Sequence, residues 1–414
     1  NNFGPRFGFA WKPFGSQKSV IRGGYGIFFE GPSTSANAAS LGFELSGATS
    51  SPDNGVTPAF YLRNGPDIAI GKAELNDAFG AVPFGKRAST NVSFYEQNRR
   101  TGYAQHLNLG FQREIAHNMI VEVRYTGNMS RKLPTGNMQI NQVPIENAGP
   151  GNAQVKRPYP QFNSVTVLSP TIGSNNYHSG TARIEKRYSG GLAFTAGYTW
   201  SRAIGDTVNT NGGLGEDQTW QDIYNRRLDK GPDALDIIHR FVWSSTYDLP
   251  FGNGRRWLAD GLLSKIVGGW TVGSIASLQS GGPFTVTTSS NTTNVFSAGA
   301  QRANLIDEPN LAASERSVER WFNTDAFEAP PAYTFGNAGR GIVRGDGRVN
   351  FDFAINKNFY FTEQRYVQFR GDLFNSFNHP DFVLPNHTLG NANFGTIGGS
   401  TDGRTIQLGL RIVF

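Results

Sequence analysis

The chain has 414 residues, a net charge of +6, 51 glycines and no cysteine. The missing cysteine excludes disulfides, zinc-thiolate sites and thiol catalysis, and no stretch approaches the ~20 apolar residues of a membrane-spanning helix. With 13% aromatic and only 17% charged residues, the composition favours β-structure with polar loops over a disordered chain or a helical enzyme. The positive charge forms no basic tract, so nucleic acid is not an expected partner.

Alternation of apolar and polar side chains predicts about eleven strands. Strands at 6–12 and 19–29 come first. Two hairpins follow, one formed by 105–115 and 119–127 around a tight turn, the other by 181–188 and 192–201 around Ser189-Gly190-Gly191. The remaining strands are expected at 240–249, 269–279, 348–358, 365–374 and 404–414.

The connections between these strands alternate in length. The short ones are 13–18, 116–118, 189–191, 250–268 and 359–364, and the long ones are 30–104, 128–180, 202–239, 280–347 and 375–403. Successive connections of an antiparallel up-and-down sheet lie at opposite ends, so all the long ones project from one end. This pattern is typical of an antiparallel transmembrane β-barrel of the bacterial outer membrane, with short periplasmic turns and long extracellular loops. A barrel of this kind is surrounded by outer-membrane lipid.

The two ends of the chain carry further signals. The sequence begins Asn1-Asn2-Phe3 without Met or a signal peptide, although 6–12 already reads as a strand, so we expect a longer protein. In the last strand every second residue is apolar up to a terminal aromatic, which resembles the signal read by the barrel assembly machinery. A chance amphipathic strand is the alternative. The residues of this signal are Ile406, Leu408, Leu410, Ile412 and Phe414.

Several blocks of the sequence resemble the barrel of TonB-dependent receptors of the Oar-like type. Their order and spacing make the resemblance strong, although residues 30–102 match only as a variable loop. The blocks are RPYPQFNSV at 157–165, IEKRYSGGLAFTAGYTWSRAI at 184–204, HRFVWSSTYDLPFGNGRR at 239–256, GGWTVGSIASLQSGGPFTV at 268–286, FGNAGRGIVRGDG at 335–347, QFRGDLFNSFNHPDF at 368–382, ANFGTIGG at 392–399 and QLGLRIVF at 407–414.

The resemblance implies the architecture and the activity. Such receptors have about 22 strands around an N-terminal plug, often preceded by a carboxypeptidase-regulatory-like domain. Residues 1–414 would then be the C-terminal half of a barrel, about 11 of 22 strands, without the plug, the TonB box or the signal peptide. The implied activity is uptake of a scarce solute, captured by extracellular loops and admitted when TonB rearranges the plug. A passive porin, a surface or adhesion barrel without transport, and a soluble β-sandwich enzyme are the alternatives.

No catalytic, cofactor or metal site is expected, because the six histidines are scattered and no nucleotide or hydrolase motif occurs. The candidate site residues are charges expected to face the lumen, either paired along a wet wall or in contact with a plug or a solute. These are Glu122, Arg124, Arg183, Glu185, Arg370, Asp372 and Arg411. Aromatic residues of the loops either bind a solute by stacking or, the favoured interpretation, pack the loops together. They are Trp220, Tyr224, Phe284, Trp321, Phe322 and Phe327.

Overall fold

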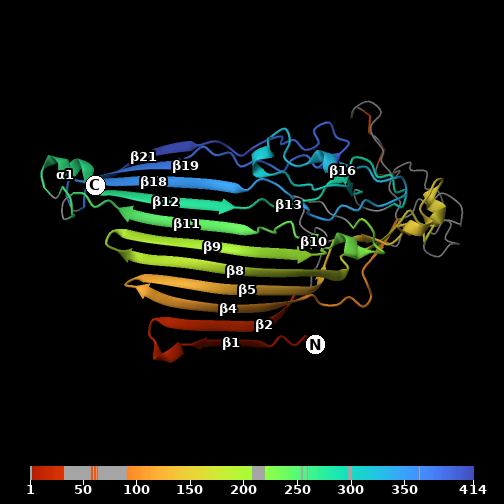
Figure 1. The fold of residues 1–414 in the computed structure, drawn as a ribbon, viewed down its shortest axis with the longest axis horizontal. Helices are drawn as coiled ribbons and strands as arrows, with labels where there is room; N and C mark the ends of the chain where they lie inside the picture. Colours follow the sequence, from red (N-terminus) through yellow and green to blue (C-terminus); the bar gives the residue numbers. More distant parts are fainter. Residues whose placement is uncertain are drawn as a thin grey trace.

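The computed structural model describes residues 2–31, 57–58, 60–61, 63, 91–207, 220–252, 255–258, 260–296, 301–362 and 364–414. One antiparallel sheet dominates it, and each strand pairs with the next long strand along the chain (Figure 1). The eleven predicted strands are therefore confirmed. They are β1 (Arg6–Trp11), β2 (Ser19–Phe29), β4 (Tyr103–Ala116), β5 (Met119–Pro134), β8 (Thr171–Ser189), β9 (Leu192–Gly205), β11 (His239–Asp248), β12 (Trp270–Gln279), β18 (Arg348–Tyr360), β19 (Tyr366–Phe374) and β21 (Thr405–Val413).

The sheet is open. Within the described ranges β1 pairs only with β2 and β21 only with β19, so each has one edge without a partner strand. A short twelfth member, β10 (Gly231–Pro232), pairs with β9. The predicted all-β antiparallel fold class is confirmed, with the sheet not closed in this chain.

Strands β5 and β8 are longer than predicted. The ladder between them continues through Asn128–Tyr177 and Ser130–Asn175 to the pair of Pro134 and Thr171, so the predicted loop 128–180 was wrong at both ends. The loops predicted at 30–104 and 202–239 likewise lose residues to β4 and β9. The reason is that backbone pairing needs no apolar side chains, whereas the prediction relied on apolar alternation, which stops in this polar segment.

Connections sort by length as predicted: short turns lie at one end of the sheet and long connections at the other (Figure 1). The short-turn end carries η1 (Pro13–Gly15) and α1 (Leu262–Val267). In the described ranges no helix is long and apolar enough to cross a membrane. The long connections carry β3 (Asn91–Phe94), β6 (Met138–Gln139), β7 (Ser164–Val167), β13 (Pro283–Phe284), β14 (Thr287–Thr288), β15 (Asn304–Leu305), β16 (Phe327–Glu328), β17 (Val343–Arg344), β20 (Thr388–Leu389), η3 (Ile145–Asn147), η4 (Ala153–Lys156), η5 (Arg226–Asp229), η6 (Ala313–Glu315) and η7 (Thr324–Ala326).

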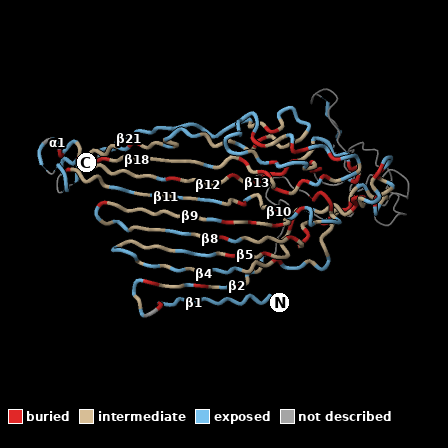
Figure 2. Tube along the Cα trace, in the orientation of Figure 1, coloured by how far each residue is buried: buried red, intermediate tan, exposed pale blue. Residues whose placement is uncertain are grey.

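Most buried residues lie among the long connections, and fewer lie on the strands of the sheet (Figure 2). The larger hydrophobic core is built by the β12–β18 connection, with side chains of the β19–β21 connection packed against it. Its rings meet edge to face, for example Phe322 with Phe394 at a centroid distance of 5.3 Å. The long connections therefore fold into a packed layer of their own, which we call the loop layer.

The two faces of the sheet differ in chemistry. One, the apolar face, leaves large apolar side chains exposed; the other, the polar face, carries Glu122, Arg124 and Arg183. A soluble domain buries such an apolar surface, whereas a barrel wall presents it to lipid. Exposed residues of the apolar face are Phe7, Phe9, Trp11, Leu107, Leu109, Phe111, Val123, Tyr125, Tyr198, Trp200, Tyr247, Ile406, Leu408, Leu410 and Ile412.

Candidate functional site

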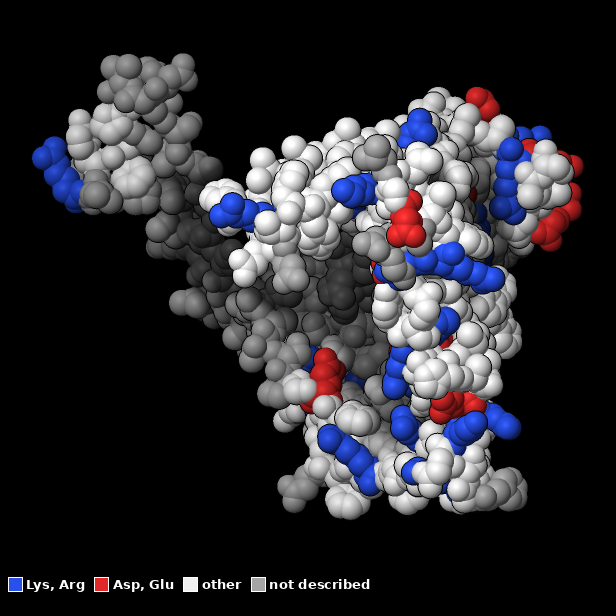
Figure 3. Space-filling model, turned by 90° about the vertical axis from the view of Figure 1, so that its left-hand side faces the viewer, with Lys and Arg blue, Asp and Glu red and all other residues white. Residues whose placement is uncertain are grey.

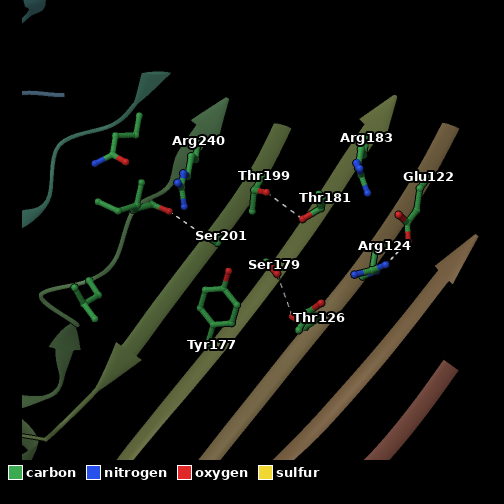
Figure 4. A pocket seen from close by; sticks show the side chains of 13 residues that line it. Glu122, Arg124, Thr126, Tyr177, Ser179, Thr181, Arg183, Thr199, Ser201 and Arg240 are labelled. Carbon is green, nitrogen blue, oxygen red and sulfur yellow. Dashed lines mark hydrogen bonds and ion pairs between the residues drawn. The ribbon is translucent and has the colours of Figure 1, made fainter. Parts of the chain in front are cut away.

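The polar face lines a cavity of about 480 Å³ that spans strands β5 to β12. Glu122 lies opposite Arg183 in the ladder, so the register brings predicted residues of separate strands together. Side chains of β5, β8, β9 and β11 converge on this space (Figure 4), and the molecule is hollowed when viewed from the short-turn end (Figure 3). The lining residues are Glu122, Arg124, Thr126, Tyr177, Ser179, Thr181, Arg183, Thr199, Ser201, Leu235, Ile237, Arg240 and Gln279.

Predicted charges of the polar face form ion pairs between neighbours two residues apart on one strand. Arg124 pairs with Glu122, Arg183 with Glu185 at 2.9 Å, and Arg370 with Asp372 at 2.7 Å. Period-two geometry puts such residues on one face. The arginine side chains are about half exposed, so water and salt screen each pair and it contributes little to the stability of the fold. Their main effect is on the charge of the cavity wall.

Hydroxyl groups and one loop complete the cavity. Thr181 and Thr199 share a hydrogen bond of 3.1 Å between their hydroxyl oxygens. Ser201 donates a hydrogen bond of 2.6 Å to the carbonyl oxygen of Ile237, which ties the segment before β11 to the wall. Leu235 and Ile237 thereby contribute the apolar part of the lining.

A second hollow of about 390 Å³ adjoins the first and shares Glu122, Arg124 and Thr126 with it. It reaches Arg22 on β2. Among the ion pairs that the structure describes, none involves Arg22 or Arg240. The cavity wall therefore carries an excess of positive charge, which attracts anionic groups.

Two buried carboxylates, which sequence reasoning missed, stabilise the loop layer, and the first of them also ties it to the sheet. Asp236, 1% exposed, pairs with Arg344 and, at 3.1 Å, with Arg202 of β9. It also accepts a 2.6 Å hydrogen bond from the backbone N–H of Ala203.

The second buried carboxylate, Asp229, pairs with Arg302, and burial raises the pKa of this aspartate. Arg340 donates to the carbonyl oxygen of Asp229 at 3.2 Å. The sequence signal that could have led to these two carboxylates is the block FGNAGRGIVRGDG, which contains their partners Arg340 and Arg344.

Most of the loop aromatics are buried in the loop layer. Trp220 is 3%, Trp321 9% and Phe322 1% exposed, so their rings have no open face for a solute. These three residues are therefore withdrawn as candidates for stacking on a solute. Phe284 and Phe327 belong to the same core. Tyr224 alone of the candidate set is exposed, and its hydroxyl donates to the carbonyl oxygen of Gln142 at 2.9 Å.

The remaining predicted residues lie on β21 or, for Phe414, directly after it. Arg411 is opposite Gln368 of β19 and shares the polar face with Arg370. The apolar residues of the last strand are exposed on the apolar face, and Phe414 is 97% exposed. No group of three or more potential ligands for a metal ion occurs in the part of the chain that the structure describes.

Comparison with known proteins gives one family match. The model of the family described as "Outer membrane beta barrel domain" matches residues 1–407. No curated protein matches the chain.

Among solved structures, the outer membrane transporter YddB from Escherichia coli is similar at a TM-score of 0.49 and 13% identity, over 100% of this chain and 41% of YddB. The FrpB iron transporter from Neisseria meningitidis is similar at 0.44 and 13%, over 99% of this chain and 39% of FrpB. The ferripyoverdine receptor of the outer membrane of Pseudomonas aeruginosa is similar at 0.43 and 11%, over 100% of this chain and 33% of that receptor. This chain thus spans 33–41% of the length of these structures.

Proposed function

Because the chain belongs to the outer membrane beta-barrel domain family and so lies in the bacterial outer membrane, we propose that it is part of the wall of a TonB-dependent receptor or transporter. Its polar face lines the route of a scarce solute, and its loop layer lies on the extracellular side. We assign it no catalytic role. The observation that carries the proposal is an open sheet with one apolar and one charged face, in a chain with Oar-like sequence blocks.

The open edges support closure by further strands. Unpaired backbone groups of β1 and β21 would each cost several kcal/mol in hydrocarbon. Bacterial single-chain barrels have an even number of strands, whereas the consecutive strands here number eleven. We therefore propose that the complete barrel contains strands beyond these, as the roughly 22-stranded receptors do.

Partners follow from the same proposal. The charged wall around Arg124, Arg183 and Arg240 contacts an N-terminal plug domain, which TonB rearranges to admit the solute. β21, with Phe414, is the strand that the barrel assembly machinery recognises. The solute first meets the loop layer, where Tyr224 remains exposed.

Uptake by cells tests the proposal. Wild-type cells, cells that lack this protein and cells that lack TonB are grown in one complex medium, and depletion of its solutes is compared by mass spectrometry. We expect at least one solute class to be depleted by wild-type cells and spared equally by both mutants. A solute that is spared only when the protein itself is absent contradicts TonB coupling and favours a passive porin. No change in any solute contradicts transport.

A further inference from the structure

The turn between β11 and β12 carries an exposed apolar surface at the short-turn end of the sheet. In α1, Leu263 is 62% and Ile266 63% exposed, and before the helix Trp257 is 51% and Leu258 49% exposed. We call these four residues the foot. Large apolar side chains left exposed within one short connection are a feature of interaction sites.

Contacts of α1 place the foot beside the apolar face of the sheet. Lys357 and Trp270 are a cross-strand pair on that face, and Trp270 packs against Phe369 at 6.1 Å. The Lys357 ammonium group donates to the carbonyl oxygen of Lys265 at 2.8 Å and to that of Ile266.

The indole N–H of Trp270 also donates to the Ile266 carbonyl oxygen, at 3.2 Å. Helix C-terminal carbonyls attract cations. The last turn of α1 is therefore fastened to the side of the wall that faces lipid.

Basic residues flank the foot along the sequence and outnumber the one acidic residue among them, Asp260. Arg256 lies over the ring of Trp257, 5.7 Å from its centroid, and Lys265 is exposed on α1 itself. Arg255 pairs with Asp248 at 3.1 Å. Apolar and aromatic side chains bordered by lysine and arginine characterise segments that lie in the membrane interface, where basic residues attract anionic headgroups.

We propose that the foot inserts into the phospholipid leaflet at the short-turn end, with Leu263 and Ile266 among the acyl chains. Arg256 and Lys265 bind the headgroups of anionic phospholipid. The foot continues the lipid-facing belt of the sheet beyond the strands and fixes the depth of the wall in the membrane. The inference rests on the proposed placement of the short turns at the periplasmic leaflet, where the lipid is phospholipid.

Probe accessibility tests the foot. Since this sequence has no cysteine, a fluorophore is attached to the single substitutions Leu263→Cys and Ile266→Cys in the full-length protein, in nanodiscs of phosphatidylethanolamine and phosphatidylglycerol. Quenching by spin-labelled lipid is compared with quenching by aqueous iodide. Leu109→Cys on the apolar face is the lipid control, and His117→Cys, in another short turn at the same end, is the aqueous control.

We expect both α1 probes to follow the Leu109 probe and the His117 probe to respond to iodide. If the α1 probes follow the His117 probe while the Leu109 probe stays in lipid, the proposed insertion of the foot is overturned, but the membrane placement of the sheet stands. If the Leu109 probe is also quenched by iodide, that placement itself fails. Protection of the α1 probes from both quenchers indicates a protein partner and overturns the proposal.

The charges are tested separately. Combining Arg256→Gln with Lys265→Gln is expected to reduce lipid quenching of the Ile266 probe in discs that contain phosphatidylglycerol. The same pair of substitutions should have no effect in discs of phosphatidylcholine alone. An equal effect in both kinds of disc, or none in either, contradicts the binding of anionic headgroups.

Discussion

Replacing Asp236 by alanine is expected to release the loop layer from the sheet. The substitution leaves the guanidinium groups of Arg344 and Arg202 without their carboxylate and the N–H of Ala203 without its acceptor. Breaking a buried pair costs about 3–5 kcal/mol. Because Arg344 is 21% and Arg202 38% exposed, water compensates in part, and we expect the lower limit of about 3 kcal/mol. Asn at position 236 retains an acceptor and should lose less, about 1.5 kcal/mol.

Hydrogen exchange of the full-length protein in nanodiscs measures this loss, because local opening sets the exchange rate. A loss of about 3 kcal/mol corresponds to exchange faster by roughly a hundredfold. We expect it in peptides 231–238 and 341–347, while peptide 119–127 of β5 is unchanged. The control Asp325→Ala removes an exposed pair with Arg320 and should have almost no effect. Unchanged exchange in the loop peptides, or equal acceleration in β5, would refute the reasoning.

Three further predictions concern the wall, its last strand and the loop core. Val123→Arg on the apolar face should lower the free energy of unfolding in lipid vesicles by about 2–4 kcal/mol. The control Gln112→Arg, opposite Glu122 on the polar face, should lower it less. Equal losses in denaturant titrations would contradict the assignment of faces. Phe414→Ser should lower the amount of protein assembled in the outer membrane, and an unchanged amount would count against its role as a signal. The loop core is the larger hydrophobic core of the loop layer, and the ring of His387 packs against its Phe284 at a centroid distance of 5.6 Å. Burial lowers the pKa of His387, so the unfolded loop core binds more protons than the folded one. The contribution of His387 to the stability of that core is fully present above the usual histidine pKa of about 6.5 and falls as the pH drops below it. Unfolding followed by tryptophan fluorescence should therefore show lower stability at about pH 5.5 than at about pH 7.5. The substitution His387→Asn should abolish this difference.

The strands were predictable because a two-faced sheet enforces a period of two in the sequence. Residues 121–125, for example, alternate between Val and Tyr on one face and Glu and Arg on the other. The extension of β5 to Pro134 was not predictable in this way, since Arg131 interrupts the alternation between Met129 and Leu133. Helix α1 was missed for a related reason, because six residues are too few to establish helical periodicity.

The loop layer could not be derived from local patterns. Asp236 and Arg344 are 108 residues apart in sequence, and nothing in the neighbourhood of either residue indicates the other. The aromatic rings posed the same difficulty, because Trp321 and Phe322 have the composition of a binding surface and of a core alike. Only long-range packing decides that they are buried, whereas pairs such as Arg370 and Asp372 follow directly from their spacing.

The central claim is that this sheet is a membrane wall with lipid on one face and water on the other. Spin labels placed singly at residues 121–125 of β5, in the full-length protein in outer-membrane vesicles, test it through accessibility to oxygen and to a water-soluble nickel chelate. We expect oxygen accessibility to peak at Val121, Val123 and Tyr125 and chelate accessibility to peak at Glu122 and Arg124. Equal access of the chelate to both sets of positions would contradict it.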